Sequence, residues 1–374
     1  MAGSGTWRES RLAGTRRGAL PDPGGPVRLS PDPVLLRVRG GPLTCGWPVA
    51  VWGRDRLLTR ASHPCVTGAS RTCDQFATGS LPGRGGVGGA GYRLPVRVPV
   101  DPGPVLASLA ARAVPGVEEV DVVAGTVRRL VDLGSGPVPV TAHVTAGGAE
   151  VRADGPTAPG ATDRLAVRWF GLGDALAPVH DTLGDDPTLG PLLAARPHLR
   201  VPGHPDGFEA AVQAVLTQQV SLGAGRTTGG RLAAAYGREH ASGLRAYPRP
   251  EDVAAADPVA LQAVLRVPRT RARAVHALAV ACAQGLRLDP GADGPDVRAA
   301  LLAVPGIGPW TADVVALRAL GDRDAFPSGD LVLRRALGAP GPRDVAAAGL
   351  RWRPWRAFAA THLWASVTTT GPVG

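Results

Sequence analysis

Apolar and polar residues alternate along short segments in the first half of the chain, beginning at Tyr92. Such a period of two places successive side chains on opposite faces of a sheet and predicts β-strands. Four segments show it: 92–98, 126–132, 137–145 and 149–152. Residues 105–114 have the three-to-four spacing of an amphipathic helix instead. We therefore expect a small antiparallel sheet with one or two helices, ending by about residue 185.

From about residue 186 the apolar residues recur at helical spacing, with short Pro and Gly interruptions. Phe208, Ala211, Val212, Val215 and Leu216 form one such stripe. The expected helices are 208–216, 221–236 ended by Gly237, 269–283, 296–303, 311–320, 331–337 and 355–366. The predicted fold class is α+β, with an α+β domain of residues 92–185 followed by an all-α body of residues 186–374.

Residues 1–91 show neither period and are rich in Gly, Pro and Arg. This composition cannot bury enough apolar surface to fold, so the sequence predicts a disordered extension. With 12 arginines and 5 acidic residues, the segment carries much of the chain's positive charge. Three interpretations stay open for this segment. It is a basic arm that contacts nucleic acid, a tail without a role, or a stretch translated only because the start codon was assigned wrongly.

The composition allows one or two ordinary cores, because 44% of the 374 residues are hydrophobic. The formal net charge is +10, and every basic residue among the 41 is arginine, since the chain contains no lysine. Arginine suits phosphate, so this balance favours a polyanionic partner. A GC-rich coding bias towards Arg, Ala, Gly and Pro explains it equally well.

The sequence predicts no metal site, no cofactor and no membrane segment. Cys45, Cys65, Cys73 and Cys282 lie at spacings that match neither zinc nor iron–sulfur sites, and the eight histidines are scattered. No apolar run approaches the ~18 residues of a membrane span, and no secretory signal is evident. We expect a cytoplasmic protein with free thiols.

The most informative motif is Val-Pro-Gly-Ile-Gly-Pro-Trp-Thr-Ala-Asp at 304–313. A helix enters the Pro-Gly-Ile-Gly turn and a second helix begins at Pro309, where proline suits the first turn. We expect Ile307 to anchor the turn in the core, and the amides of Gly306 and Gly308 to face outward, where they can hold a phosphate. A simple helical hairpin without a ligand fits the same pattern.

A carboxylate follows about twenty residues later, in Ser328-Gly329-Asp330. Local sequence predicts that Asp330 is a helix N-cap that accepts the amide of Val332 or Leu333. Such a position is compatible with catalysis, because an anion that faces a phosphate-binding hairpin can stabilise a developing cation.

Together these motifs resemble the helix-hairpin-helix DNA glycosylase superfamily, and more closely its 3-methyladenine DNA glycosylase II branch. The resemblance runs from about residue 92 to 367 and includes Leu-Ala-Ala-Arg-Ala-Val at 109–114 and Gln-Gln-Val-Ser at 218–221. It implies that Asp330 is the catalytic carboxylate, which stabilises an oxocarbenium-like sugar after the damaged base has been flipped out. The other roles it implies are base-pocket walls at Trp310 and Trp364, contacts to the DNA backbone at Gly306, Ile307, Gly308 and Thr311, and an intercalating wedge at Gln219.

The expected reaction class, hydrolysis with or without a lyase step, depends on a lysine that this chain lacks. Relatives with lyase activity carry a lysine after the hairpin, where this chain has Trp310, so the resemblance implies a monofunctional glycosylase. Two departures stand out: Val314 replaces an aromatic pocket residue of some relatives, and Arg266 replaces an expected glycine. Packing of the protein's own core is an alternative role for both Trp310 and Trp364.

We therefore expect a base-excision enzyme that hydrolyses the glycosidic bond of alkylated purines such as 3-methyladenine and 7-methylguanine. Its partner would be double-stranded DNA containing alkylated bases, and the resemblance suggests a monomer. The main alternative is a helix-hairpin-helix protein that binds damaged DNA without catalysis. An alkylation-response regulator, whose cysteine pattern is absent, and a helical protein-interaction module remain further alternatives.

Overall fold

The computed structural model describes residues 98–368. The predicted disordered extension at 1–91 and residues 92–97 of the first predicted strand lie outside the described residues. Residues 98–100 form no regular element. Three of the four cysteines also lie outside the described part, and Cys282 is a free thiol.

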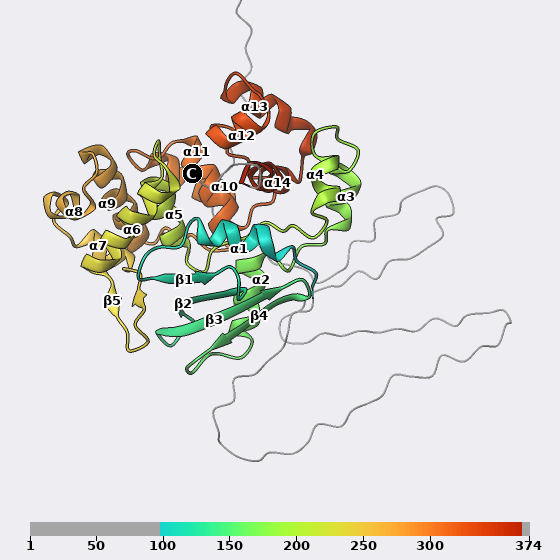
Figure 1. The fold of residues 1–374 in the computed structure, drawn as a ribbon. Helices are drawn as coiled ribbons and strands as arrows, with labels where there is room; N and C mark the ends of the chain where they lie inside the picture. The colour runs from blue at the N-terminus through green and yellow to red at the C-terminus, as the bar shows by residue number, and fades with distance from the viewer. Residues whose placement is uncertain (1–97, 369–374) are drawn as a thin grey trace, which may run out of the picture. The chain divides into compact units, whose positions relative to one another are not determined.

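A four-stranded antiparallel sheet follows the first helix of the described chain, and its strands lie side by side in sequence order (Figure 1). The strands are β1 (Glu118–Asp121), β2 (Thr126–Asp132), β3 (Pro137–Thr145) and β4 (Gly148–Ala153). The alternating pattern predicted β2, β3 and β4 correctly, whereas the short β1 was missed. The register pairs Val127 with Ala142 and Val131 with Val138, so these apolar side chains share one face.

Two helices cover that apolar face, α1 (Pro102–Ala110) and α2 (Ala161–Phe170). Helix α1 ends four residues before the predicted end; Pro115 disfavours helical geometry at Val114. Residues 111 and 112 form a turn, and the amides of residues 111–113 still bond back to α1. Helix α2 is the second helix that the sequence allowed without giving its position. It buries Trp169 and Phe170 against the sheet and gives the small domain most of its aromatic core.

The rest of the described chain is helical apart from a two-stranded ladder, β5 (Arg238–Glu239) and β6 (Arg245–Ala246). This confirms the predicted fold class of a small antiparallel sheet followed by a helical body. The helices are α3 (Ala177–Leu183), α4 (Gly190–Ala195), α5 (Gly207–Leu216), α6 (Leu222–Tyr236), α7 (Pro250–Ala254), α8 (Pro258–Leu265), α9 (Arg269–Ala283), α10 (Gly294–Ala303), α11 (Pro309–Val315), the π-helical turn η1 (Ala316–Leu320), α12 (Leu331–Ala336), α13 (Pro342–Gly349), the 3₁₀ turn η2 (Leu350–Trp352) and α14 (Arg356–Thr368).

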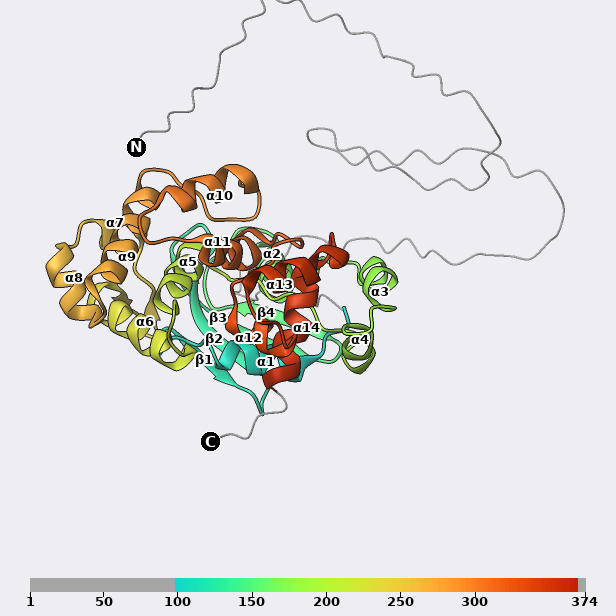
Figure 2. The ribbon, with the colours of Figure 1, turned by 90° about the horizontal axis from the view of Figure 1, so that it is seen from above.

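The helical body has two apolar cores. Helices α5, α6, α8, α9, α10 and α11 share one core, and α3, α4, α12, α13 and α14 share the other. In the view from above, α6 to α9 lie on one side of α11, and α12 and α14 lie on the other (Figure 2). The predicted helix 311–320 changes to π geometry at Ala316, a feature common at functional sites. This arrangement leaves a groove where the two cores and α1 meet.

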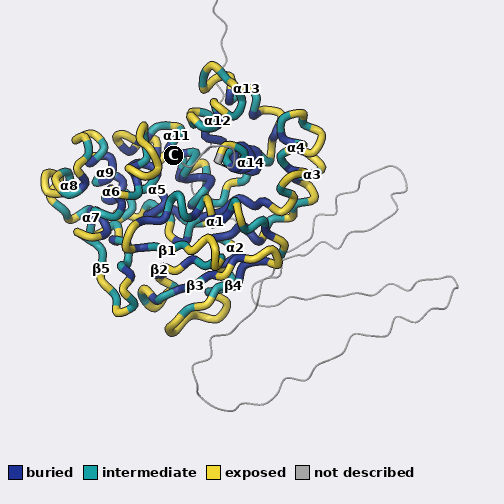
Figure 3. The backbone as a smooth tube through the Cα atoms, viewed as in Figure 1, coloured by how far each residue is buried: buried dark blue, intermediate teal, exposed yellow. Residues whose placement is uncertain are grey.

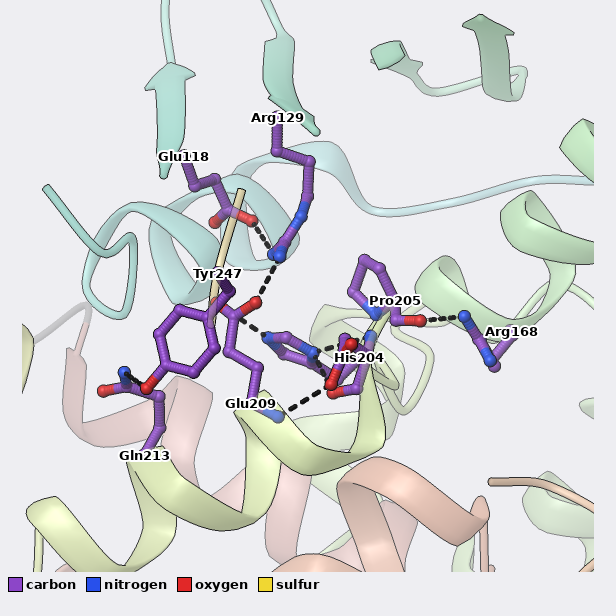
Figure 4. Close-up of polar contacts among 9 residues, drawn as sticks. Glu118, Arg129, Arg168, His204, Pro205, Glu209, Gln213 and Tyr247 are labelled. Atoms are coloured by element: carbon purple, nitrogen blue, oxygen red, sulfur yellow. Dashed lines mark hydrogen bonds and ion pairs between the residues drawn. The ribbon is translucent and has the colours of Figure 1, made fainter. Parts of the chain in front are cut away.

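A buried ionic cluster joins the sheet to the helical body (Figure 4). Arg129 of β2 is 2% exposed and donates through Nη1 to Glu118 of β1 (2.8 Å) and through Nη2 to Glu209 of α5. Burial, which outweighs the effect of the Arg129 charge, raises the pKa of Glu209 to about 7. Two carboxylates therefore depend on a single guanidinium for their charge compensation.

Helix α14 is the most deeply buried helix of the second core, with Ala357 to Leu363 almost inaccessible (Figure 3). It carries His362, which is 2% exposed and has no hydrogen-bond partner for Nδ1. Burial lowers the pKa of His362 to about 4. The neutral imidazole is thus part of the folded core.

No helix within residues 98–368 is long and apolar enough to cross a membrane.

Replacing Arg129 by Met should lower the free energy of unfolding by about 3–5 kcal/mol, because Glu118 and Glu209 would stay buried without their counter-charge. Urea unfolding of the purified chain measures this loss. The matched control is Arg152→Met, which removes an exposed ion pair with Asp154 and should cost at most about 1 kcal/mol. Equal losses in both variants would contradict a structural role for the cluster.

Acidification should destabilise the fold through His362. The unfolded chain takes up the proton near pH 6.5 and the folded chain only near pH 4, so this contribution is present above pH 6.5 and is lost as the pH falls to 4. The shift corresponds to about 3 kcal/mol. His362→Gln should show a smaller loss of stability over this interval in denaturant titrations at several pH values, and an unchanged pH dependence would refute the assignment.

Candidate active site

A tight turn joins α10 to α11, and Gly306 and Gly308 of this turn line the groove. Gly306 has a φ of 88°, and a Cβ there would lie 2.8 Å from the Cβ of Ala274 on α9, so both backbone geometry and packing require glycine. Ile307 is 6% exposed and belongs to the first core, which confirms its expected role as the anchor of the turn. The hairpin is thereby fixed against α9.

The amides of Gly306 and Gly308 make no hydrogen bond to the protein within the described residues, and Gly306 is exposed. Both lie at the start of α11, whose first-turn N–H groups also lack partners within the helix. The turn can therefore offer several donors to one anion, while the predicted outward direction of these amides and their contact with DNA stay predictions.

Asp330 is the N-cap of α12, as predicted. Its Oδ1 accepts the backbone N–H groups of Val332 (2.9 Å) and Leu333 (3.0 Å). The preceding Gly329 lies against α11, where a Cβ would stand 3.4 Å from the Cβ of Trp310. The lack of a side chain at Gly329 thus lets the loop that carries Asp330 approach the hairpin closely.

Both predicted pocket tryptophans meet this carboxylate. Trp310 of α11 donates its Nε1–H to Oδ2 of Asp330 (3.3 Å), and Trp364 of α14 donates its Nε1–H to Oδ1 (3.1 Å). The carboxylate thus accepts four N–H donors from three helices. All three residues line a groove of about 1080 Å³ and are partly exposed to it.

Two arginines that sequence reasoning did not single out line the same groove. Burial lowers the pKa of Arg112 on the segment after α1, while the charge of Asp330 raises it in part. Burial and then the charge of Arg112 lower the pKa of Arg318 well below its ordinary value. The guanidinium of Arg318 lies 5.7 Å from the ring centroid of Trp364. A charged residue in the otherwise apolar segment 316–320 was the only sequence signal for Arg318.

The loop between α5 and α6 forms one rim of the groove. Gln219, the predicted wedge, is exposed and has a φ of 55°, a left-handed geometry that is uncommon outside glycine. Its neighbours Val220 and Leu222 are also exposed. The structure therefore places Gln219 at the rim, and its insertion into DNA stays a prediction.

Thr311 lies inside the protein, at 2% exposure, and its hydroxyl accepts a hydrogen bond from Nε2 of Gln218 (2.8 Å). Its predicted contact with the DNA backbone would have to be made by its main-chain amide. Sequence reasoning missed Gln218 as a contact, since its partners are about ninety residues away along the chain.

Both departures from the family pattern have structural consequences. Val314 lines the groove with an aliphatic side chain. Arg266 ends α8 with a φ of 55°, which is the left-handed geometry that favours glycine. Among the residues that the structure describes, no group of three or more His, Cys, Asp or Glu side chains is arranged to hold a metal ion.

Two family models match the chain. One describes the AlkA N-terminal domain and matches residues 91–206, which include the sheet, α1 and α2. The other describes the HhH-GPD superfamily of base excision DNA repair proteins and matches residues 212–341, which include the hairpin and Asp330.

Curated relatives agree with these models. The chain is 42% identical to the probable bifunctional transcriptional activator/DNA repair enzyme AlkA of Mycobacterium tuberculosis, over 75% of this chain and 58% of that protein. It is 38% identical to DNA-3-methyladenine glycosylase 2 of Escherichia coli, over 47% of this chain and 63% of that protein. The chain thus spans less than two thirds of the length of either relative.

Among solved structures, the 3-methyladenine DNA glycosylase from Archaeoglobus fulgidus has the same fold, with a TM-score of 0.65 at 20% identity over 75% of this chain and all of that one. The chain therefore carries an AlkA N-terminal domain followed by a domain of the HhH-GPD superfamily of base excision DNA repair proteins, and both curated relatives are similar to it over this part.

Proposed function

We propose that the chain is a monofunctional DNA glycosylase that hydrolyses the N-glycosidic bond of alkylated purines such as 3-methyladenine and 7-methylguanine. The observation that carries this proposal is the carboxylate of Asp330, which four N–H donors hold in a groove lined by Trp310 and Trp364. The names of relatives from Escherichia coli and Bacillus subtilis, which are called 3-methyladenine glycosylases, support the substrate class.

The chemistry requires charge stabilisation more than proton transfer. A purine alkylated at N3 or N7 is cationic, so it leaves without further protonation, and positive charge develops on the sugar as the C1′–N bond breaks. A fixed carboxylate lowers the energy of that oxocarbenium-like state, and water then adds to C1′ and releases one proton to the solvent. Because its donors already fix the side chain, Asp330 needs no reorganisation when the charge appears.

The groove can take up a base only after that base has left the duplex. Electron-rich faces of Trp310 and Trp364 would attract a cationic base, while Gln219 at the rim would fill the gap left in the stack. The free amides of Gly306 and Gly308 would hold a phosphate of the damaged strand. The partner is then double-stranded DNA that contains alkylated bases, bound by one copy of the chain.

The product would be an intact abasic site. A lyase step needs an amine that forms a Schiff base with the sugar, and the chain contains no lysine. Trp310 occupies the position after the hairpin and contacts Asp330 instead.

Replacing Asp330 by Asn should reduce the single-turnover release of 7-methylguanine from alkylated duplex DNA by at least about a hundredfold, because the charge is lost while an N-cap remains. Asp257→Asn is the matched control. Asp257 caps α8 through the same two amide contacts, at 3.0 and 2.8 Å, but lies outside the groove.

Full activity of the Asp257 variant and loss in the Asp330 variant support the proposal. Equal release by native chain and Asp330→Asn would refute it, and tight DNA binding without any release would favour the non-catalytic alternative.

The absence of lyase activity predicts that borohydride will not trap the chain on DNA that carries an abasic site. Strand scission at that site should also stay at the level of the protein-free control. Gel electrophoresis of labelled DNA measures both products. A borohydride-dependent covalent complex or stimulated strand scission would contradict a purely hydrolytic mechanism.

A further inference from the structure

One amide side chain links the hairpin to the loop that carries the predicted wedge. Nε2 of Gln218 donates to the carbonyl oxygen of Gly306 (3.0 Å) and to the hydroxyl of Thr311 (2.8 Å). These two bonds use both hydrogens of the amide nitrogen. Gln218 precedes the left-handed Gln219 directly, so the amide ties the wedge loop to the hairpin turn at Gly306 and to the first turn of α11 at Thr311.

The main chain of the loop is fixed at the same residue. Nη2 of Arg271, in the first turn of α9, donates to the carbonyl oxygen of Gln218 (2.6 Å). Helix α9 also packs against Gly306 through Ala274. The loop, the hairpin and α9 therefore form one connected unit around Gln218.

This connection can offset the conformational cost of the backbone geometry at Gln219. A non-glycine residue with left-handed geometry costs about 1–3 kcal/mol and persists only where its surroundings hold it. Gln219 has this geometry although it is exposed. Among the described residues, the side chain of its neighbour Gln218 ties the loop to the hairpin through two hydrogen bonds.

We propose that Gln218 is a positioning residue that keeps the wedge in register with the hairpin. This inference rests on the proposed function. If the hairpin holds a phosphate and Gln219 enters the stack, the fixed spacing between them decides which nucleotide leaves the duplex. Neighbouring nucleotides of one strand lie only about 3.4 Å apart along the helix axis, so a small displacement of the loop would aim the wedge at the wrong step.

Replacing Gln218 by Ala should slow the single-turnover release of 7-methylguanine from duplex DNA by about tenfold to a hundredfold, since small misplacements cost about that much. Release from single-stranded DNA should fall by less than about threefold, because an unpaired base needs little help to leave the stack. Gln218→Glu should behave like Gln218→Ala, because a carboxylate cannot donate to the Gly306 carbonyl.

The matched control is Gln284→Ala, which removes an exposed amide at the end of α9 and should change neither rate. Equal losses on the duplex and single-stranded substrates would overturn the proposal, since a damaged fold or damaged chemistry affects both. An unchanged rate on duplex DNA would overturn it as well.

A second readout separates this inference from the proposed function. In an Asp330→Asn background, 2-aminopurine placed beside an alkylated base reports unstacking by a rise in fluorescence on binding. We expect the rise with Gln218 present and its loss in the double variant Asp330→Asn, Gln218→Ala. If the native chain releases no base, the proposed function fails, and the fluorescence difference still decides whether Gln218 positions the wedge; equal fluorescence in both chains would reject it.

Discussion

The hydrogen bonds to Asp330 are the constraint on which the site depends. The carboxylate is held by two main-chain amides of α12 and by two indole N–H groups that come from α11 and α14. All four hydrogen bonds to this carboxylate can form only if α11, α12 and α14 approach one another within hydrogen-bond distance of Asp330. The two cores place these helices: Ile307 anchors the hairpin before α11 in the first core, and α12 and the buried segment of α14 belong to the second core.

The same groove contains opposing charges. Arg112 and Arg318 line it with Asp330, and both guanidinium groups are partly stripped of water, which lowers their pKa. A cationic base would be repelled by these two groups and attracted by Asp330 and by the tryptophan rings. In the proposed mechanism the Asp330 carboxylate would therefore have to act on the sugar at close range, because the net charge of the groove does not favour a cation.

Local signals predicted much of the fold and part of the site. The alternation of Val138, Val140, Ala142 and Val144 marked β3, and α9 was predicted over its full length from helical spacing. The N-cap role of Asp330 was equally local. The contact of Asp330 with Trp364 could only be expected from the family resemblance, because 34 residues separate them, and Gln218 was missed because its partners belong to the hairpin. Interactions between distant segments depend on how the two helical cores pack, which no local pattern encodes.

The most direct test of the central claim is the affinity for an analogue of the charged sugar. DNA with a cationic pyrrolidine at an abasic position should bind the native chain at least about a hundredfold more tightly than DNA with a neutral tetrahydrofuran there, as a transition-state analogue does. In Asp330→Asn the two affinities should become nearly equal. Equal affinities in the native chain, or an undiminished preference in the variant, would contradict the account.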